Sequence, residues 1–258
     1  MRPKLGVLDR MMAFLREASV MLRCTLQQAR VDLAIAPGVT VVFSAPTSLT
    51  AEKVKTLDGE SSSWRVIVER LRDDDCFWDV GANFGLYAIP AARVGARVVA
   101  FEPVAAWRGM LISNKRLNGL GRLQVMPVAL GDHLAIMTLV YKSQLGSGMG
   151  GDAAYGDEWI PRDEAVRQRA MMVRGVDLVE SGAVPAPTVM KVDVEGGELG
   201  VLRGMGDLLK SEPLRAVFCE LHRPEGPNSA VMQLLESAGF RIVEIEKRRS
   251  ESMILAER

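Results

Sequence analysis

The sequence has little excess charge, few cysteines and no long apolar run, and each absence excludes a class of protein. Its 32 basic and 32 acidic side chains cancel. Nucleic-acid binders usually carry a basic excess or stripe, so no nucleic-acid partner is expected. The three cysteines, Cys24, Cys76 and Cys219, are widely separated and form no Cys-x-x-Cys motif. This spacing indicates neither a zinc knuckle nor a disulfide framework, and it favours a reducing, cytoplasmic location.

Charged side chains also interrupt the apolar segments near the start of the chain. No run approaches the roughly 18 apolar residues of a spanning helix, and no signal-peptide core is visible. The stretch from about Leu8 to Val31 has the pattern of an amphipathic helix. We therefore expect residues 1–60 to form an N-terminal helical extension. It could pack on the main domain, cover the active site as a lid, or bind a membrane or a partner.

From residue 61 to residue 258, strand and helix patterns alternate. Such alternation predicts an α/β fold with a doubly wound, mainly parallel sheet. An antiparallel hairpin is expected to close this sheet near the end of the chain. The expected strands are Cys76–Val80, Arg97–Phe101, Leu123–Val128, His133–Lys142, Thr188–Val194 and Arg215–Leu221, with Val173–Val179 as a short strand and turn and Phe240–Glu246 and Ser252–Ala256 as the hairpin.

The glycine spacing after the first of these strands predicts a nucleoside pocket. Gly81 and Gly85 follow an apolar run, and the next strand ends in Glu102, 102 − 81 = 21 residues after Gly81. An acid at about this distance can hold the two ribose hydroxyls of a nucleoside. The pattern lacks the central glycine of a dinucleotide motif, however, because Asn83 stands in its place. A nucleoside other than a nicotinamide dinucleotide is therefore favoured.

Acidic side chains and a histidine gather at the ends of the later strands. Parallel strands place such residues along one edge of the sheet, where doubly wound proteins bind ligands. Asp193 and Glu195 share one face of their strand with Lys191, and Glu220 shares a face of the next strand with His222. Charged residues are costly to bury, so they indicate either a functional site or a buried, satisfied ion pair.

Five motifs in order resemble the FkbM-type S-adenosylmethionine-dependent methyltransferases. They are Asp79-Val-Gly-Ala-Asn-Phe-Gly, Ala100-Phe-Glu-Pro, Ala129-Leu-Gly-Asp, Lys191-Val-Asp-Val-Glu-Gly-Gly-Glu and Glu220-Leu-His. The resemblance spans about Trp64 to the end of the chain and implies a seven-stranded Rossmann-like methyltransferase sheet. It also implies that Asp79, Gly81, Asn83 and Gly85 surround the methionine part of the cofactor, that Glu102 holds its ribose, that Pro127–Ala129 borders its adenine, and that Asp193 lies near the methyl donor.

The leading hypothesis for the reaction is O-methylation of a hydroxyl on a sugar or other small metabolite. A hydroxyl needs help to lose its proton, and we expect His222 to act as the base. Asp193, Glu195 or Glu220 would position the base or the acceptor. In a variant of this hypothesis, Asp193, Glu195, Glu220 or His222 holds Mg²⁺ or Mn²⁺. The other histidine, His133, is expected at the surface.

Two competing functions stay open at this level. One is a nicotinamide-dependent oxidoreductase on a similar sheet, which the glycine spacing disfavours. The other is a non-catalytic methyltransferase-like binding module, which has no need for clustered acids at strand ends. Neither the oligomeric state nor the methyl acceptor follows from the sequence. A glycine-rich segment, Gln144–Gly156, is read either as a mobile lid or as a surface insertion.

Overall fold

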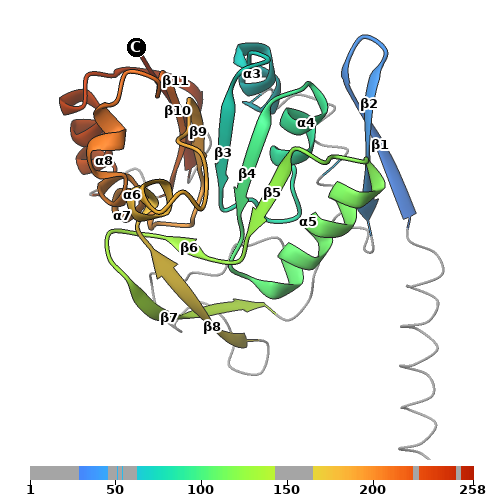
Figure 1. Ribbon diagram of the computed structural model, residues 1–258, viewed down its shortest axis with the longest axis horizontal. Coiled ribbons are helices and arrows are strands. Elements are labelled where there is room, and N and C mark those ends of the chain that lie inside the picture. Colours follow the sequence, from blue (N-terminus) through green and yellow to red (C-terminus); the bar gives the residue numbers. More distant parts are fainter. Residues whose placement is uncertain are drawn as a thin grey trace, which may run out of the picture.

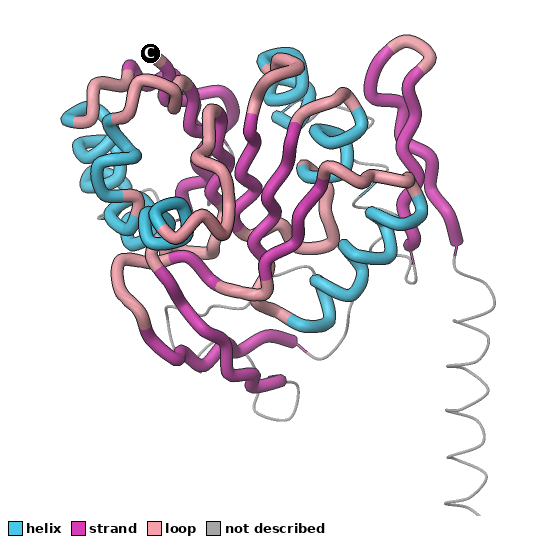
Figure 2. Tube along the Cα trace, viewed as in Figure 1, coloured by secondary structure: helices cyan, strands magenta, loops and turns pink. Residues whose placement is uncertain are grey.

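The computed structural model describes residues 29–45, 51, 54, 63–142, 165–222, 227–247 and 251–258. A seven-stranded sheet forms its centre (Figures 1 and 2). From one edge to the other its strands are β11 (Arg241–Lys247), β12 (Glu251–Glu257), β10 (Ala216–His222), β9 (Val189–Val192), β3 (Cys76–Val80), β4 (Arg97–Phe101) and β5 (Leu123–Met126). The five strands from β10 to β5 are parallel, whereas β12 runs antiparallel to both β10 and β11. The predicted sheet with its closing antiparallel hairpin is confirmed.

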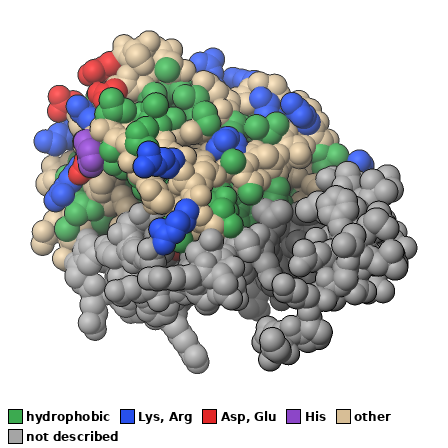
Figure 3. Space-filling view, turned by 90° about the horizontal axis from the view of Figure 1, so that it is seen from below, with side chains coloured by type: hydrophobic (Ala, Val, Ile, Leu, Met, Phe, Trp, Pro, Cys, Tyr) green, Lys and Arg blue, Asp and Glu red, His purple; other side chains and the backbone are tan. Residues whose placement is uncertain are grey.

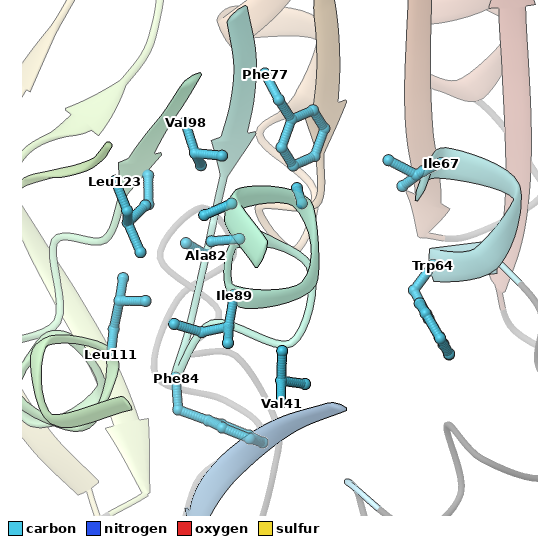
Figure 4. Packing of buried hydrophobic residues seen from close by; sticks show 14 of the residues in the cluster. Val41, Trp64, Ile67, Phe77, Ala82, Phe84, Ile89, Val98, Leu111 and Leu123 are labelled. Atoms are coloured by element: carbon cyan, nitrogen blue, oxygen red, sulfur yellow. The ribbon is translucent and has the colours of Figure 1, made fainter. Parts of the chain in front are cut away.

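Apolar side chains cover both faces of this sheet. Along β3, Phe77 belongs to one buried cluster and Trp78 to the other, since successive side chains point to opposite faces. Helices α3 (Ser63–Arg70), α4 (Ala88–Arg93) and α5 (Ala105–Leu117) contribute to the first cluster, in which Ile89 and Leu111 approach the sheet (Figure 4). The second cluster includes side chains of α7 (Glu198–Gly204), the 3₁₀ helix η1 (Gly206–Lys210) and α8 (Pro227–Ser237). The sheet is therefore doubly wound, as the sequence predicts.

A second, three-stranded sheet lies below the carboxyl ends of the parallel strands in Figure 1. Its strands, in order, are β6 (Ala129–Leu130), β8 (Ala165–Val173) and β7 (Ala135–Lys142). On its outer face Ile136 and Met171 are cross-strand neighbours and both are exposed. Seen from below, apolar side chains interleave with Lys and Arg (Figure 3). The segment 144–156, predicted as a lid or insertion, lies outside the described residues.

The predicted short strand and turn over Val173–Val179 is wrong in most of its length. Val173 ends β8, and Gly175–Glu180 form helix α6. Packing explains the difference, because a Cβ on Gly175 would lie 2.6 Å from Met205 Sδ and 3.2 Å from the Trp78 ring. The segment therefore packs closely on Met205 and Trp78 at the start of α6, a contact that its β-rich local composition does not reveal.

The structure also corrects the predicted helical extension, because two antiparallel strands occupy part of it. They are β1 (Ala29–Ala36) and β2 (Val39–Ala45). Val31, Leu33 and Ile35 are buried while Arg30 and Asp32 are exposed, which is the period of a strand. The expected helix thus cannot extend to Val31. Residues 1–28 lie outside the described residues, so a helix there, and the division at residue 60, stay predictions.

Among the described residues no helix is long and apolar enough to cross a membrane. Of the three cysteines, Cys76 and Cys219 are described, and both are buried free thiols. Burial raises the pKa of the Cys76 thiol to about 11, which disfavours a reactive thiolate. Both cysteines are therefore small core residues.

Candidate active site

A cavity of about 260 Å³ lies at the carboxyl ends of β3, β4 and β9. This is the edge at which doubly wound sheets bind ligands. The inner face of the second sheet forms one wall through Met137, Leu139 and Met172. Of the residues predicted from the sequence, seven line the cavity: Gly81, Asn83, Glu102, Val128, Ala129, Asp193 and Glu195.

The two glycines of the first loop have different surroundings. Gly81 has a φ of +80°, and a Cβ there would lie 1.8 Å from the carbonyl oxygen of Asp193. A side chain is therefore excluded by the protein's own backbone, although Gly81 also lines the cavity. Gly85 is not among the lining residues, and a Cβ there would lie 2.6 Å from Leu111 Cδ1. Its missing side chain admits helix α5, so the structure gives Gly85 a packing role.

Glu102 presents a fixed carboxylate to the cavity. Its Oε2 accepts a hydrogen bond from the Asn83 amide at 2.7 Å, and its Oε1 accepts one from the Val104 amide at 2.7 Å. Burial raises the pKa of Glu102 to about 7, although both amides act to lower it. Each carboxylate oxygen has a further lone pair, which suits it to accept hydrogen bonds from a ligand's hydroxyls.

A buried lysine joins the ends of β3 and β9. Lys191 is only 2% exposed, and its Nζ lies 2.9 Å from Asp193 Oδ2 and 3.7 Å from Asp79 Oδ1. It also lies 4.4 Å from the centre of the Tyr87 ring. Burial alone would lower the pKa of Lys191, but Asp193 and Asp79 outweigh it and hold this pKa above its ordinary value. Lys191 therefore carries a buried positive charge.

Asp79 is fully buried and does not line the cavity. Within the described part of the chain, neither of its carboxylate oxygens has a hydrogen-bond partner. Burial raises the pKa of Asp79 to about 6, against the opposing charge of Lys191. The family resemblance placed Asp79 beside the methionine part of the cofactor, and the sequence left open a site or a buried ion pair for Asp193. Both acids pair with Lys191, but only Asp193, which is 23% exposed, reaches the cavity.

The turn after β9 is held by a residue that the sequence analysis missed. Glu198, 4% exposed, accepts hydrogen bonds through Oε1 from the amides of Gly196 at 2.9 Å and Val194 at 3.3 Å. Between them Glu195 adopts a φ of +57°, which is costly for a side chain of its kind. A glutamate in a first helical turn is a known capping signal, and it could have identified Glu198.

Gln168 of β8 was also missed. Its Oε1 accepts a hydrogen bond from the Ala105 amide at 2.9 Å, and its Nε2 donates one to the Pro103 carbonyl at 2.7 Å. These two bonds tie the second sheet to the start of α5 and so hold that wall of the cavity. No sequence signal pointed to Gln168, because it lies in a strand, β8, that the sequence pattern does not predict.

The predicted catalytic groups of β10 stand apart from the lining residues. Glu220 is half-buried and does not line the cavity, although its charge contributes to the raised pKa of Lys191. His222 is the last residue of β10 and pairs with Glu251, but its side chain lies outside the described set.

Among described residues no group of three or more His, Cys, Asp or Glu could hold a metal ion. His133 is exposed, as predicted, with its Nδ1 2.6 Å from Asp132 Oδ1.

Residues 79–242 match the model of a known protein family, the methyltransferase FkbM domain. The chain belongs to the FkbM methyltransferase family. This membership confirms the family resemblance and the predicted S-adenosylmethionine-dependent methyltransferase activity, in preference to a nicotinamide-dependent oxidoreductase.

Two curated relatives support the same assignment. The chain is 31% identical over 207 residues to the hexuronic acid methyltransferase AglP of Haloferax volcanii, covering 80% of each protein. It is 29% identical over 196 residues to the 31-O-demethyl-FK506 methyltransferase FkbM of Streptomyces tacrolimicus, covering 67% of this chain and 75% of that protein. A solved structure, the precorrin-6Y C5,15-methyltransferase of Geobacter metallireducens, is similar with a TM-score of 0.48 and 16% identity over 78% of this chain and 90% of that one.

Proposed function

We propose that this family member transfers a methyl group from S-adenosylmethionine to a hydroxyl oxygen on a sugar or other small metabolite. The observation that carries the proposal is the pair of acidic side chains, Asp193 and Glu195, that follows β9 and lines the cavity. Carboxylates at this position can accept the hydrogen bond of a hydroxyl and orient its oxygen. The names of two relatives, one acting on a hexuronic acid and one on an O-demethyl metabolite, support an oxygen acceptor.

The lining residues fit this cofactor. Glu102 would accept hydrogen bonds from the two ribose hydroxyls, for which its carboxylate is already oriented by two amides. Gly81, Asn83 and Asp193 would border the methionine part, and Ala129 the adenine. When bound, the cofactor supplies an electrophilic methyl carbon on a positively charged sulfur. The charges of Asp193 and Glu195 at the cavity are complementary to that cation.

We assign His222 as the base that removes the acceptor's proton, with Asp193 and Glu220 as the groups that position it or the acceptor. His222 ends β10, which is the parallel neighbour of β9, so it belongs to the same edge of the sheet as Asp193. Neutral imidazole suits proton removal near pH 7. Mg²⁺ or Mn²⁺ held by Asp193, Glu195, Glu220 or His222 is the variant of this hypothesis, and exhaustive chelation with unchanged turnover would eliminate it.

The acceptor class can be tested with purified enzyme and labelled S-adenosylmethionine. We expect methyl transfer to hydroxyl-bearing acceptors, with hexuronic acids and their glycans tried first, and an O-methyl signal in the product by NMR. His222→Ala should lower kcat by about 100-fold or more while S-adenosylhomocysteine still binds. Exposed His133→Ala is the matched control and should leave kcat unchanged. An N-methyl product, or normal kcat in His222→Ala, would contradict the proposal.

The buried free thiols of Cys76 and Cys219 support a reducing, cytoplasmic location as part of this proposal. The proposed partner is the small-molecule or glycan acceptor itself. Residues 1–60 would then be an extension to the methyltransferase domain of residues 61–258.

A further inference from the structure

The cavity contains a buried hydrogen-bond donor that the protein does not use. Trp107, in the first turn of α5, lines the cavity and is 5% exposed. Within the described part of the chain its indole Nε1 has no hydrogen-bond partner. A buried N–H without an acceptor costs free energy that a phenylalanine at this position would avoid. A tryptophan that keeps this donor beside a cavity points to an acceptor on the ligand.

Another buried tryptophan shows how this fold treats such a group elsewhere. Trp78, on β3, is also fully buried, and its Nε1 donates a hydrogen bond to the Pro185 carbonyl at 3.0 Å. Trp78 has a partner within the protein, whereas Trp107 does not. The difference is that Trp107 lies at the cavity and Trp78 does not.

The surroundings of Trp107 determine the kind of acceptor. Val104, Met137 and Leu139 line the same cavity and belong to the apolar cluster that contains Trp107. Such walls suit the faces of a flat heteroaromatic ring, and they would desolvate a carboxylate or a sugar without compensation. An aromatic base offers ring nitrogens that accept a hydrogen bond in the plane of the ring. An adenine ring therefore fits this apolar wall better than the sugar or metabolite to be methylated, for which the acidic residues of the same cavity are the better partners.

The position of Trp107 in the chain agrees with an acceptor on the cofactor's base. It lies three residues after Val104, whose amide holds the Glu102 carboxylate, so both residues belong to the start of α5. The acidic turn of Asp193 and Glu195 follows β9, two strands away from β4. Trp107 thus reaches the cavity from the segment that follows β4 and carries Glu102, whereas Asp193 and Glu195 reach it from the end of β9.

We propose that the Trp107 indole N–H donates a hydrogen bond to a ring nitrogen of the cofactor's adenine. This residue then contributes to cofactor affinity and to selection for the adenine base. The inference rests on the S-adenosyl cofactor of the proposed function, and it concerns only the base and not the methyl acceptor.

Calorimetry with S-adenosylhomocysteine tests the donor directly. Trp107→Phe keeps an aromatic ring and removes the N–H, so affinity should fall about tenfold. Trp64→Phe, at a buried tryptophan of α3 that does not line the cavity, should leave affinity unchanged. The KM for the methyl acceptor should not change in either variant. Unchanged affinity in Trp107→Phe, or an effect only on the acceptor's KM, would overturn the inference.

A second measurement uses the unaltered protein. S-Adenosylhomocysteine analogues with carbon in place of adenine N1, N3 or N7 should show one analogue binding about tenfold more weakly than the parent. Trp107→Phe should lose nothing further against that same analogue. Equal affinity for all three analogues would refute the inference while leaving the methyltransferase assignment intact. Failure of the unaltered protein to bind S-adenosylhomocysteine would refute both.

Discussion

At the scale of single residues, burial sets the chemistry of the site. Asp79, Glu102 and Lys191 are each at most 5% exposed, and two of them are carboxyls whose pKa is raised by that burial. Asp79 has a charged partner in Lys191, whereas Glu102 relies on two backbone amides. Glu102 is therefore the group whose protonation state a ligand or a change of pH alters most directly at the cavity.

The raised pKa of Glu102 predicts a stability that falls with rising pH. Its carboxyl titrates near 4.5 when unperturbed and at about 7 in the folded protein. Between these values the folded state holds a proton that the unfolded state has released, so unfolding becomes easier as pH rises from about 4.5 to about 7. Urea denaturation of the ligand-free protein across this range should show the decline, and Asp79 contributes in the same direction with its pKa of about 6.

Glu102→Gln should flatten that decline, because the glutamine does not titrate. The exposed carboxyl of Asp207 provides the matched control, and Asp207→Asn should retain the full slope. The same slope in Glu102→Gln and in the unaltered protein would show that Glu102 does not titrate in this range.

At the scale of elements, one ion pair couples β3 to β9. Lys191 lies opposite Asp79 in the parallel ladder, so the two side chains share one face of adjoining strands. The loop after β3 also passes so close to the Asp193 carbonyl that only glycine fits at position 81. The ends of these two strands therefore hold each other, and through Asp193 they hold one side of the cavity.

Replacing the lysine of this pair should be strongly destabilising. Lys191→Met leaves the Asp79 charge buried without its counter-charge, and we expect a loss of about 3 kcal/mol in the free energy of unfolding at pH 8. The double variant Lys191→Met with Asp79→Asn should recover part of the loss, because no uncompensated buried charge then remains at Asp79. Exposed Lys210→Met is the control and should be nearly neutral. Additive losses in the double variant would rule out the coupling.

At the scale of the whole molecule, side-chain amides attach two small sheets to the central one. Gln168 holds the second sheet to the start of α5. Asn118, which directly follows α5, exchanges hydrogen bonds with both backbone groups of Val42, and Asn114 of α5 accepts one from the Ser44 amide and donates one to the Phe84 carbonyl. Phe43 of β2 packs edge-on against Phe84 in the loop after β3, with 6.2 Å between the two ring centres. The hairpin thus supports the loop that forms the cavity.

Asn114, which is buried, should contribute more than Asn118 to the stability that this attachment provides. Asn114→Ala removes the partners of a buried amide and carbonyl, and we expect it to lower the free energy of unfolding by about 2 kcal/mol. Asn118→Ala, at the residue directly after the same helix, is the matched comparison. Its bonds to Val42 are only partly buried, so water can replace them and the loss should be smaller. Equal losses in urea denaturation would contradict this ranking.

The sequence by itself determined the parallel sheet and most of the cavity's polar residues. Strand ends are readable because apolar runs stop at Asp79, Glu102 and Asp193, and the carboxyl ends of parallel strands meet at one edge. The sequence spacing identified Gly81 and Gly85, but it did not show why a side chain is excluded at these positions. That exclusion comes from close packing against Asp193 and Leu111, which lie far away in the chain.

Only the tertiary structure decided the apolar half of the site. Neither Trp107 nor Gln168 is part of a recognisable sequence motif. Trp107 lines the cavity and Gln168 ties its wall in place only because α5, the second sheet and the end of β4 meet there. Strand β8 and the β1–β2 hairpin pair only outside the central sheet, and they depend on side-chain amides and cross-strand partners elsewhere in the chain. Local periodicity carries no information about such contacts, because their energy is gained only once the chain has folded around them.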